Sequence, residues 1–370
     1  MPKFRFTEIA INSTEKKKPV EEDKFTYIGL EHLDSGTLTV SRWGSDIAPI
    51  GEKLVMKKGD VLFGKRRAYQ KKVGIAPFDG IFSAHGMVLR PREEVITKEY
   101  FPLFISSDYF LNEAIRISVG SLSPTVNWKD LKDLEFTIPS IEEQKRITPL
   151  IWAAIEAKNA YKEQIKCTDD LVKSQFIEMF GNPIMNNKGW PTKKLSEVAP
   201  EYTPVIPRQD QYWLLNLDMI ESYSGQLIER VMSTVEDMGP STSAFDSSMV
   251  LYSKLRPYLN KVIVPDEYGY ATTELVGMKP NELVLNKYFL FNLLRGDDFV
   301  SYANGISAGG HMPRMPMKQL REFPCILPPM SLQIEFAEFS AQSDKSKFEL
   351  QQAIEKVDNL IKSLIQQDNK

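Results

Sequence analysis

The sequence is poor in the residues that most often provide catalysis or bind metals. Its 370 residues include two cysteines, Cys167 and Cys325, and three histidines. Neither cysteine has a CxxC partner, and no histidine has an Asp, Glu or Cys neighbour at metal-ligand spacing, which argues against a disulfide framework and a zinc site. We therefore expect no metal in this chain and a reducing, cytoplasmic location.

A strong net charge and long apolar runs are also missing. The 46 Lys and Arg residues and the 49 Asp and Glu residues give a net charge of -3, so the surface as a whole is no polycation that attracts phosphates. No window approaches the roughly 18 apolar residues of a membrane span, and the N-terminus has no apolar core of signal-peptide length. We expect no membrane partner, and a nucleic-acid function would depend on local basic patches.

The length and composition indicate more than one folded domain. Single cores stop growing at roughly 250 residues, and the chain exceeds this size. The hydrophobic fraction of 42% and the charged fraction of 26% are close to globular averages, which excludes disorder and fibrous classes. At least two domains are expected.

The main positive feature of the sequence is an internal repeat. Residues 61–73, VLFGKRRAYQKKV, align with residues 250–262, VLYSKLRPYLNKV, at an offset of 250 - 61 = 189 in the numbering. The same offset relates 6–10 to 195–199, and Gln144 to Gln333. Between these anchors the two copies share little beyond short β-branched runs broken by turn residues. The repeat predicts an α+β protein with two similar globular domains.

Each repeat ends in a predicted long helix. The first begins after Pro139, with Ser140 and Glu143 as a capping-box pair, and ends near Phe180, before Gly181. Seam positions alternate by four and three in both helices, as in a coiled coil, and the repeat offset relates one set to the other. The proposed seam residues are Ile151, Tyr161, Ile165, Val172, Leu350, Ile354, Val357 and Ile361.

These helices are expected to join the two domains as an antiparallel coiled coil with a pseudo-two-fold relation between the repeats. The alternative is an ordinary amphipathic helix on each domain. Pro149 should kink or restart the first helix. The expected segments are a first domain at 1–141, a first helix at 142–181, a second domain at 182–330 and a second helix at 331–370.

The sequence contains partial matches to catalytic motifs but no complete one. Residues 59–66, GDVLFGKR, resemble a phosphate-binding loop, but Arg66 stands where the magnesium-binding hydroxyl is required. Asn182-Pro183-Ile184-Met185 lacks the second proline and the aromatic residue of an amino-methyltransferase motif. The absence of a complete catalytic set favours a binding protein over an enzyme.

Positive charge is concentrated where the repeat is strongest. Between Lys53 and Lys72 there are eight basic residues and one acidic residue. Basic side chains interleaved with tyrosine suit DNA, because lysine and arginine bind phosphates and arginine also reaches guanine edges. The alternative is a solvated charged hairpin. The candidate DNA-binding residues here are Lys65, Arg66, Arg67, Tyr69, Lys71, Lys72, Lys254, Arg256, Tyr258 and Lys261.

A second loop recurs at the same offset. Residues 118–127, SVGSLSPTVN, match 307–314, SAGGHMPR, and their glycines and hydroxyl groups would allow the backbone to approach a ligand closely. The alternative is a tight turn that positions the following segment. The candidates are Ser121, Thr125, Asn127, Gly310, His311 and Arg314.

Taken together, these features resemble the specificity subunits of type I restriction-modification systems. The matching features are the repeated V-L-[FY]-x-K-x-R-x-Y-x-x-K-V segment, the glycine turns before Pro124 and Pro313, the proline entries to the helices, and the Met-Phe-Gly-Asn-Pro junction. The resemblance implies two target recognition domains, each recognising half of a bipartite double-stranded DNA sequence.

The resemblance also implies which functions lie outside this chain. The helices would dock two adenine methyltransferase subunits, and restriction and translocase subunits would join the complex. S-adenosylmethionine, ATP and magnesium would be bound by those partners, so no cofactor is expected here. Two other hypotheses remain: a non-enzymatic coiled-coil scaffold that binds proteins only, and a self-sufficient enzyme with an unrecognised motif.

Overall fold

The computed structural model describes residues 2–366, and the chain forms two compact units. The first contains the residues up to Ala160 together with those from Ala353 onward, and the second is Tyr161–Gln352. Each unit has a globular part and one end of each of two long helices. The units therefore divide both helices, whereas the sequence predicts a separate segment for each helix.

The globular part of the first unit contains two four-stranded sheets and a two-stranded ribbon. One sheet has the order β2 (Ala10–Ser13), β9 (Met87–Pro91), β6 (Val61–Phe63) and β7 (Val73–Ile75). The other has the order β3 (Lys16–Lys17), β5 (Lys53–Met56), β8 (Gly80–Phe82) and β4 (Tyr27–Ile28). Only the β4–β8 pair is parallel among these described strands. The ribbon pairs β1 (Lys3–Arg5) with β10 (Glu135–Thr137).

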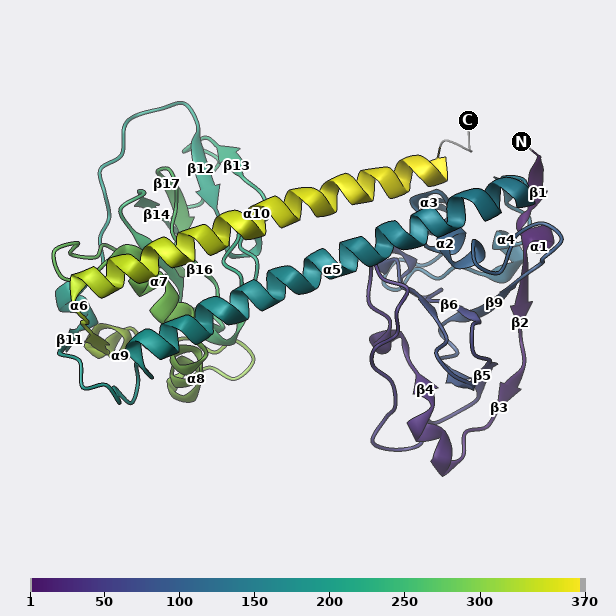
Figure 1. Ribbon diagram of the computed structural model, residues 1–370, viewed down its shortest axis with the longest axis horizontal. Helices are drawn as coiled ribbons and strands as arrows, with labels where there is room; N and C mark the ends of the chain where they lie inside the picture. The colour runs from purple at the N-terminus through teal and green to yellow at the C-terminus, as the bar shows by residue number, and fades with distance from the viewer. Residues whose placement is uncertain (1, 367–370) are drawn as a thin grey trace. The chain divides into compact units, whose positions relative to one another are not determined.

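Short helices lie between these strands and between the strands and the first long helix. They are α1 (Phe6–Ile9), η1 (Glu21–Phe25), η2 (Leu30–His32), η3 (Ala68–Gln70), α2 (Phe101–Ser106), α3 (Asp108–Arg116) and α4 (Trp128–Leu131). Phe6, Phe110 and Phe136 are fully buried in one core that also includes Ile147 and Ile151. In Figure 1, α2 and α3 lie beside the first half of α5 (Ile141–Phe180), and β3, β4 and β5 lie at the opposite end of the unit.

The second unit has a related arrangement, with one three-stranded sheet, one four-stranded sheet and a ribbon. One sheet has the order β16 (Val262–Ile263), β15 (Val250–Ser253) and β18 (Leu275–Met278). The other has the order β13 (Val231–Ser233), β12 (Tyr212–Leu215), β17 (Gly269–Thr272) and β14 (Thr242–Phe245). A ribbon pairs β11 (Thr192–Lys194) with β19 (Pro324–Ile326). The short helices are α6 (Leu195–Val198), η4 (Leu217–Met219), η5 (Pro257–Leu259), α7 (Lys287–Arg295), α8 (Asp297–Ile306) and α9 (Met317–Glu322).

The structural repeat continues through the region where sequence similarity disappears. In the first unit β8 lies between a parallel neighbour, with Tyr27 opposite Ile81, and an antiparallel one, with Val55 opposite Ile81. In the second unit Tyr270 has the same two kinds of partner, Leu214 and Ala244. The offset is 189 for the antiparallel partners but 187 for the parallel ones. Backbone ladders do not require particular side chains, so the pairing persists while the residues change.

The predicted α+β repeat with two long helices is confirmed. The first helix, α5, follows Ser140, whose hydroxyl accepts a hydrogen bond from the Glu143 amide at 3.2 Å. Only half of the capping box forms, because the Glu143 carboxylate accepts from Arg146 Nε at 2.8 Å instead. The helix ends at Phe180 before Gly181, which adopts a left-handed φ of 74°.

The expected restart of the helix at Pro149 is wrong, because α5 is continuous through this residue. Proline removes the amide that would donate to the carbonyl of Lys145. Both residues are exposed, so this carbonyl belongs to a turn that water can reach.

The second long helix is α10 (Met330–Gln366), and within each unit it runs antiparallel to α5. In the second unit Phe176 of α5 contacts Phe336 of α10, with ring centroids 5.3 Å apart, while Asp169 pairs with Lys347. Rising numbers on one helix thus meet falling numbers on the other. None of the eight proposed seam residues is exposed, and Ile151, Val172 and Ile354 are buried.

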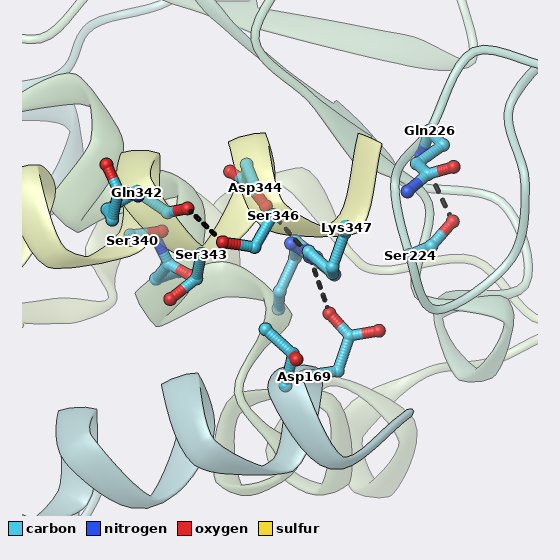
Figure 2. A network of polar contacts seen from close by, with 12 residues as sticks. Asp169, Ser224, Gln226, Ser340, Gln342, Ser343, Asp344, Ser346 and Lys347 are labelled. Atoms are coloured by element: carbon cyan, nitrogen blue, oxygen red, sulfur yellow. Dashed lines mark hydrogen bonds and ion pairs between the residues drawn. The ribbon is translucent and has the colours of Figure 1, made fainter. Parts of the chain in front are cut away.

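Two ion pairs at equivalent positions join the helices. In the first unit Lys158 Nζ lies 2.6 Å from Asp358 Oδ1, and in the second Lys347 Nζ lies 2.7 Å from Asp169 Oδ1. The repeat offset relates the two lysines, and it also relates the two aspartates. Figure 2 shows Lys347 directed toward Asp169, close to Asp344 and Ser343 of the same helix. Lys347 is 3% exposed and has Asp344 as a second partner at 2.8 Å.

A buried glutamine fastens each long helix to its globular part. Gln144 Oε1 accepts from the Thr97 amide at 2.7 Å, and its Nε2 donates to the Val95 and Pro139 carbonyls at 2.9 and 2.8 Å. Gln333 makes the equivalent bonds with Asn286, Val284 and Pro328, at 2.9, 3.1 and 2.8 Å. Both glutamines are fully buried, so each side-chain amide is satisfied by backbone groups of its own unit rather than by water.

Candidate nucleic-acid interface

The two recurrent loops of the sequence lie against each other in both units. In the first, the Arg67 amide donates to the Pro124 carbonyl at 2.7 Å, and the Val126 amide donates to the Lys65 carbonyl at 2.9 Å. In the second, the Arg256 amide donates to Pro313 at 2.7 Å, and Met315 donates to Lys254 at 2.8 Å. We call each assembly a paired-loop site, formed by residues 64–72 with 118–127 and by residues 253–261 with 307–315.

A shared backbone conformation displays one arginine at each site. Arg67 has a left-handed φ of 55° and Arg256 has one of 50°. A short 3-10 turn follows each, η3 or η5, and it ends at a second left-handed residue, Lys71 or Asn260. Non-glycine residues rarely adopt this conformation, and it concentrates at functional positions. Sequence patterns do not reveal it, because no glycine marks these positions.

The glycines of the second loop have a structural explanation. Gly120 and Gly309 are equivalent and have φ values of 117° and 121°, a region that L side chains rarely adopt. A Cβ at Gly309 would lie 2.8 Å from the Met312 carbonyl oxygen. The amide of Met312 donates to the Gly309 carbonyl at 3.0 Å, which closes the turn. The tight-turn alternative therefore accounts for these glycines without a ligand.

Three of the candidate lysines have partners within their own domain. Lys72 Nζ donates to the Leu30 carbonyl at 2.7 Å, and Lys261 Nζ donates to the Leu217 carbonyl at 2.6 Å. Lys71 Nζ contacts Asp108 at 2.6 Å. The recurrence of Lys72 as Lys261 therefore has a structural role, which residue spacing alone could not distinguish from DNA binding, whereas Lys71 corresponds to Asn260.

The remaining candidates present polar and aromatic groups to solvent. Tyr69 is 54% exposed and Tyr258 is 41% exposed. Lys65, Thr125, Lys254 and Arg256 are half-buried. The exposed candidates are Arg66, Arg67, Ser121, Asn127, Gly310, His311 and Arg314. Sequence reasoning missed Leu122, which is 91% exposed at the tip of the first glycine loop.

The first paired-loop site concentrates positive charge. Arg67 Nε donates to the Ser123 hydroxyl at 3.3 Å, and Arg66 Nη1 lies 3.5 Å from His85 Nε2. Desolvation lowers the pKa of the His85 imidazole, and the neighbouring charges of Arg66, Lys65 and Lys53 lower it further. Burial and the charge of Lys16 lower the pKa of Lys65. A neutral imidazole among cations leaves the positive charge of this surface unopposed.

The second paired-loop site has a different electrostatic arrangement. Arg314 Nη2 lies 3.1 Å from Glu274 Oε1, and this carboxylate raises the pKa of the guanidinium. Arg256 is half-buried, and its Nε has no hydrogen-bond partner in the described chain. Because this Nε atom is itself buried, it is not exposed to a phosphate or base acceptor in the described structure.

Two further observations concern metals and membranes. Across residues 2–366, no group of three or more His, Cys, Asp and Glu side chains could hold a metal ion. In the same part of the chain, no helix combines the length and the apolar character needed to cross a membrane.

Comparisons with known proteins show which proteins this chain is similar to. The family model for the type I restriction modification DNA specificity domain matches residues 6–167. The EcoDI type I restriction enzyme specificity subunit of Escherichia coli is 23% identical over 288 residues, which cover 66% of this chain and 64% of that protein. The chain thus spans less than two thirds of that relative's length. A putative MjaX specificity subunit of Methanocaldococcus jannaschii is 21% identical over 82% of this chain and 77% of its own.

Solved structures share the fold. A chain from a study of complex assembly and conformational transition of the type I R-M system matches 100% of this chain and 97% of its own, with 18% identity and a TM-score of 0.56. The S subunit of a type I restriction-modification system from M. genitalium matches 98% of this chain and 95% of its own, with 14% identity and a TM-score of 0.53. The fold class is therefore that of type I S subunits. Residues 6–167 match the family model, and most of the chain is similar to type I restriction-modification specificity subunits, which confirms the resemblance noted from the sequence.

Proposed function

We propose that this chain is the DNA-recognition component of a type I restriction-modification complex and that each globular domain recognises half of a bipartite double-stranded target. The observation that carries the proposal is the recurrence of one paired-loop site in both repeats. Each site displays a left-handed arginine, a neighbouring lysine and an exposed tyrosine. Cations attract phosphates, the arginine fork fits guanine, and tyrosine packs on sugars or bases.

The chain acts without its own chemistry. Partner subunits supply S-adenosylmethionine, ATP and magnesium, and methylation of adenine within a duplex requires the base to be flipped out of the stack by the methyltransferase. Two methyltransferase subunits dock on the long helices, and restriction and translocase subunits complete the assembly. Apolar side chains on the outer faces of these helices support a docking role, because Leu150, Leu171, Phe348 and Leu360 are each more than half exposed.

Methylation mapping tests this function and identifies the target. The chain is expressed with its methyltransferase in a bacterial host that lacks DNA methylation, and all methylated adenines are mapped. We expect a bipartite adenine motif that disappears when the chain is omitted. Co-purification of the two proteins without new methylation would contradict the recognition role and favour the protein-only scaffold.

A domain exchange tests the assignment of one half-site to each domain. Residues 1–141 are replaced by the equivalent domain of a relative, and the mapping is repeated. We expect one half of the motif to change while the other half stays the same. A change in both halves would contradict independent recognition by the two domains.

Duplex binding at several salt concentrations separates DNA recognition from the scaffold hypothesis. Lysine and arginine contacts with phosphates release counterions, so affinity must fall steeply with added salt. A protein-only scaffold would show no such binding. Binding of S-adenosylmethionine or ATP by the isolated chain would instead favour the self-sufficient enzyme.

A further inference from the structure

A third segment completes each paired-loop site. His85 lies in the turn between β8 and β9, and Glu274 lies in the turn between β17 and β18, so the repeat offset of 189 relates the two residues. The His85 carbonyl accepts from the Arg66 amide at 3.2 Å, and the Glu274 carbonyl accepts from the Lys254 amide at 3.0 Å. Both turns are therefore fixed against the basic loop by backbone contacts that do not depend on their side chains.

The side chain at this position faces an arginine in both units, but with opposite electrostatic results. His85 lies beside Arg66, with 3.5 Å between the ring and guanidinium nitrogens. Glu274 forms an ion pair with Arg314, with Nη2–Oε1 and Nε–Oε2 distances of 3.1 and 3.4 Å. The imidazole leaves the arginine charge in place, whereas the carboxylate neutralises it.

The residues near this turn increase the difference in net charge between the two paired-loop sites. In the first unit Lys53, Lys65, Arg66 and Arg67 form no ion pair with a carboxylate of the described chain. In the second unit Thr242 stands at the position of Lys53, and Leu255 stands at the position of Arg66. At the positions that correspond to Lys65 and Arg67, Lys254 and Arg256 form no ion pair with a carboxylate among the described residues.

We propose that the residue in this turn, His85 or Glu274, sets the net charge of its paired-loop site, so that the first domain supplies most of the attraction for DNA phosphates. The inference rests on the proposed DNA recognition and adds a division of labour between the two domains. Glu274 acts as an internal counter-ion that keeps Arg314 from contributing to phosphate binding. The second domain consequently depends more on its base contacts.

The substitution Glu274→Gln tests this inference, because it removes the charge and retains the size of the side chain. Binding of the full-length chain is measured over a salt series, with a duplex that contains the mapped target and a scrambled duplex of equal length. Freeing one cation should steepen the slope of log affinity against log salt by about 0.9 and raise affinity about 3- to 10-fold on both duplexes. Glu282→Gln, at an exposed position of the same unit, is the matched control and should leave the slope unchanged.

The reciprocal substitution acts on the first domain. His85→Glu should pair with Arg66, flatten the slope by about 0.9 and weaken binding to both duplexes, whereas His85→Gln should change neither. Thermal unfolding of every variant shows whether the fold is retained. An ion pair that solvent reaches contributes little to stability, so Glu274→Gln should unfold close to the wild-type temperature.

Two outcomes have separate meanings. If Glu274→Gln weakens binding to the target duplex alone and leaves the slope unchanged, Glu274 positions Arg314 or contacts a base, and the proposed counter-ion role is wrong. If the wild-type chain itself shows no salt-dependent duplex binding, the proposed function fails before the variants are considered.

Discussion

The two paired-loop sites share their backbone and differ in their charge. Arg67 and Arg256 have the same left-handed conformation and the same amide bond to a proline carbonyl, while Lys72 and Lys261 donate to equivalent backbone carbonyls. The groups that face solvent differ, because a histidine in one site is replaced by a glutamate in the other. A duplicated recognition domain can therefore change its ligand preference at exposed positions without altering the frame that holds them.

The junctions between the long helices and the globular parts also combine shared backbone contacts with different side chains. Gln144 and Gln333 make matching sets of three hydrogen bonds. A few residues further along, Ile151 of α5 corresponds to Ser340 of α10, and the latter accepts a hydrogen bond from Asn292 at 3.2 Å. At these junctions the contacts made with the backbone are kept in both units, while the residue at the position of Ile151 and Ser340 changes from apolar to polar.

The largest expected effect concerns the paired glutamines. Gln144→Leu and Gln333→Leu each remove three hydrogen bonds and leave a buried amide and two carbonyls without partners, which should cost about 2–4 kcal/mol of stability. Because the contacts match, the two variants should lose similar stability, as measured by thermal unfolding. The exposed residues Gln164 and Gln342 on the same helices are the controls, and leucine at either should have little effect. A large effect of only one buried glutamine would show that the junctions are not equivalent.

The next effect concerns the left-handed arginines. Arg67→Ala and Arg256→Ala should each weaken binding to the target duplex by about 1–3 kcal/mol if the guanidinium contacts a base. Binding to the target and to a scrambled duplex distinguishes this from a phosphate contact, which would weaken both equally.

Arg67→Gly provides the matched control for backbone effects. Glycine adopts a positive φ without steric cost, so this variant loses the guanidinium while the turn before η3 is retained or eased. It should bind DNA as weakly as Arg67→Ala and unfold at the same or a higher temperature. Wild-type affinity in either variant would contradict a DNA contact by Arg67.

Local sequence patterns predicted the two domains and the long helices of this protein. The constant offset between the repeats identified both domains, the four–three spacing identified a helix face without exposed residues, and Gly181 marked the end of α5. These features depend on neighbours within a few residues or on a repeated string, so they are visible in one sequence. Pro149 misled the prediction because its cost depends on whether water reaches the carbonyl of Lys145, which is a property of the folded surface.

The sites themselves were less accessible to sequence reasoning. Contact between the two loops of each site depends on long-range bonds such as that from Arg67 to Pro124. The sequence does not show which arginine has a left-handed backbone. It also does not distinguish a lysine that donates to the Leu30 carbonyl from one that binds DNA. The difference between these roles depends on which group the end of the side chain contacts. Only the tertiary structure determines that contact.

The smallest expected effect concerns the two ion pairs between the helices, which differ in burial. The Lys347 side chain is 4% exposed and contacts both Asp169 and Asp344, whereas the Lys158 side chain is 18% exposed and contacts Asp358. Lys347→Ala removes a buried aliphatic stem and leaves two carboxylates close together, so it should cost about 1–2 kcal/mol. Lys158→Ala should cost less than about 1 kcal/mol, because water already reaches its partner.

Hydrogen exchange measured along α5 and α10 should show faster exchange around residues 169 and 347 in the first variant, and a smaller change around residues 158 and 358 in the second. Equal effects would mean that burial of Lys347 adds nothing to the shared contact, and that the two helix pairings are energetically the same despite their different surroundings.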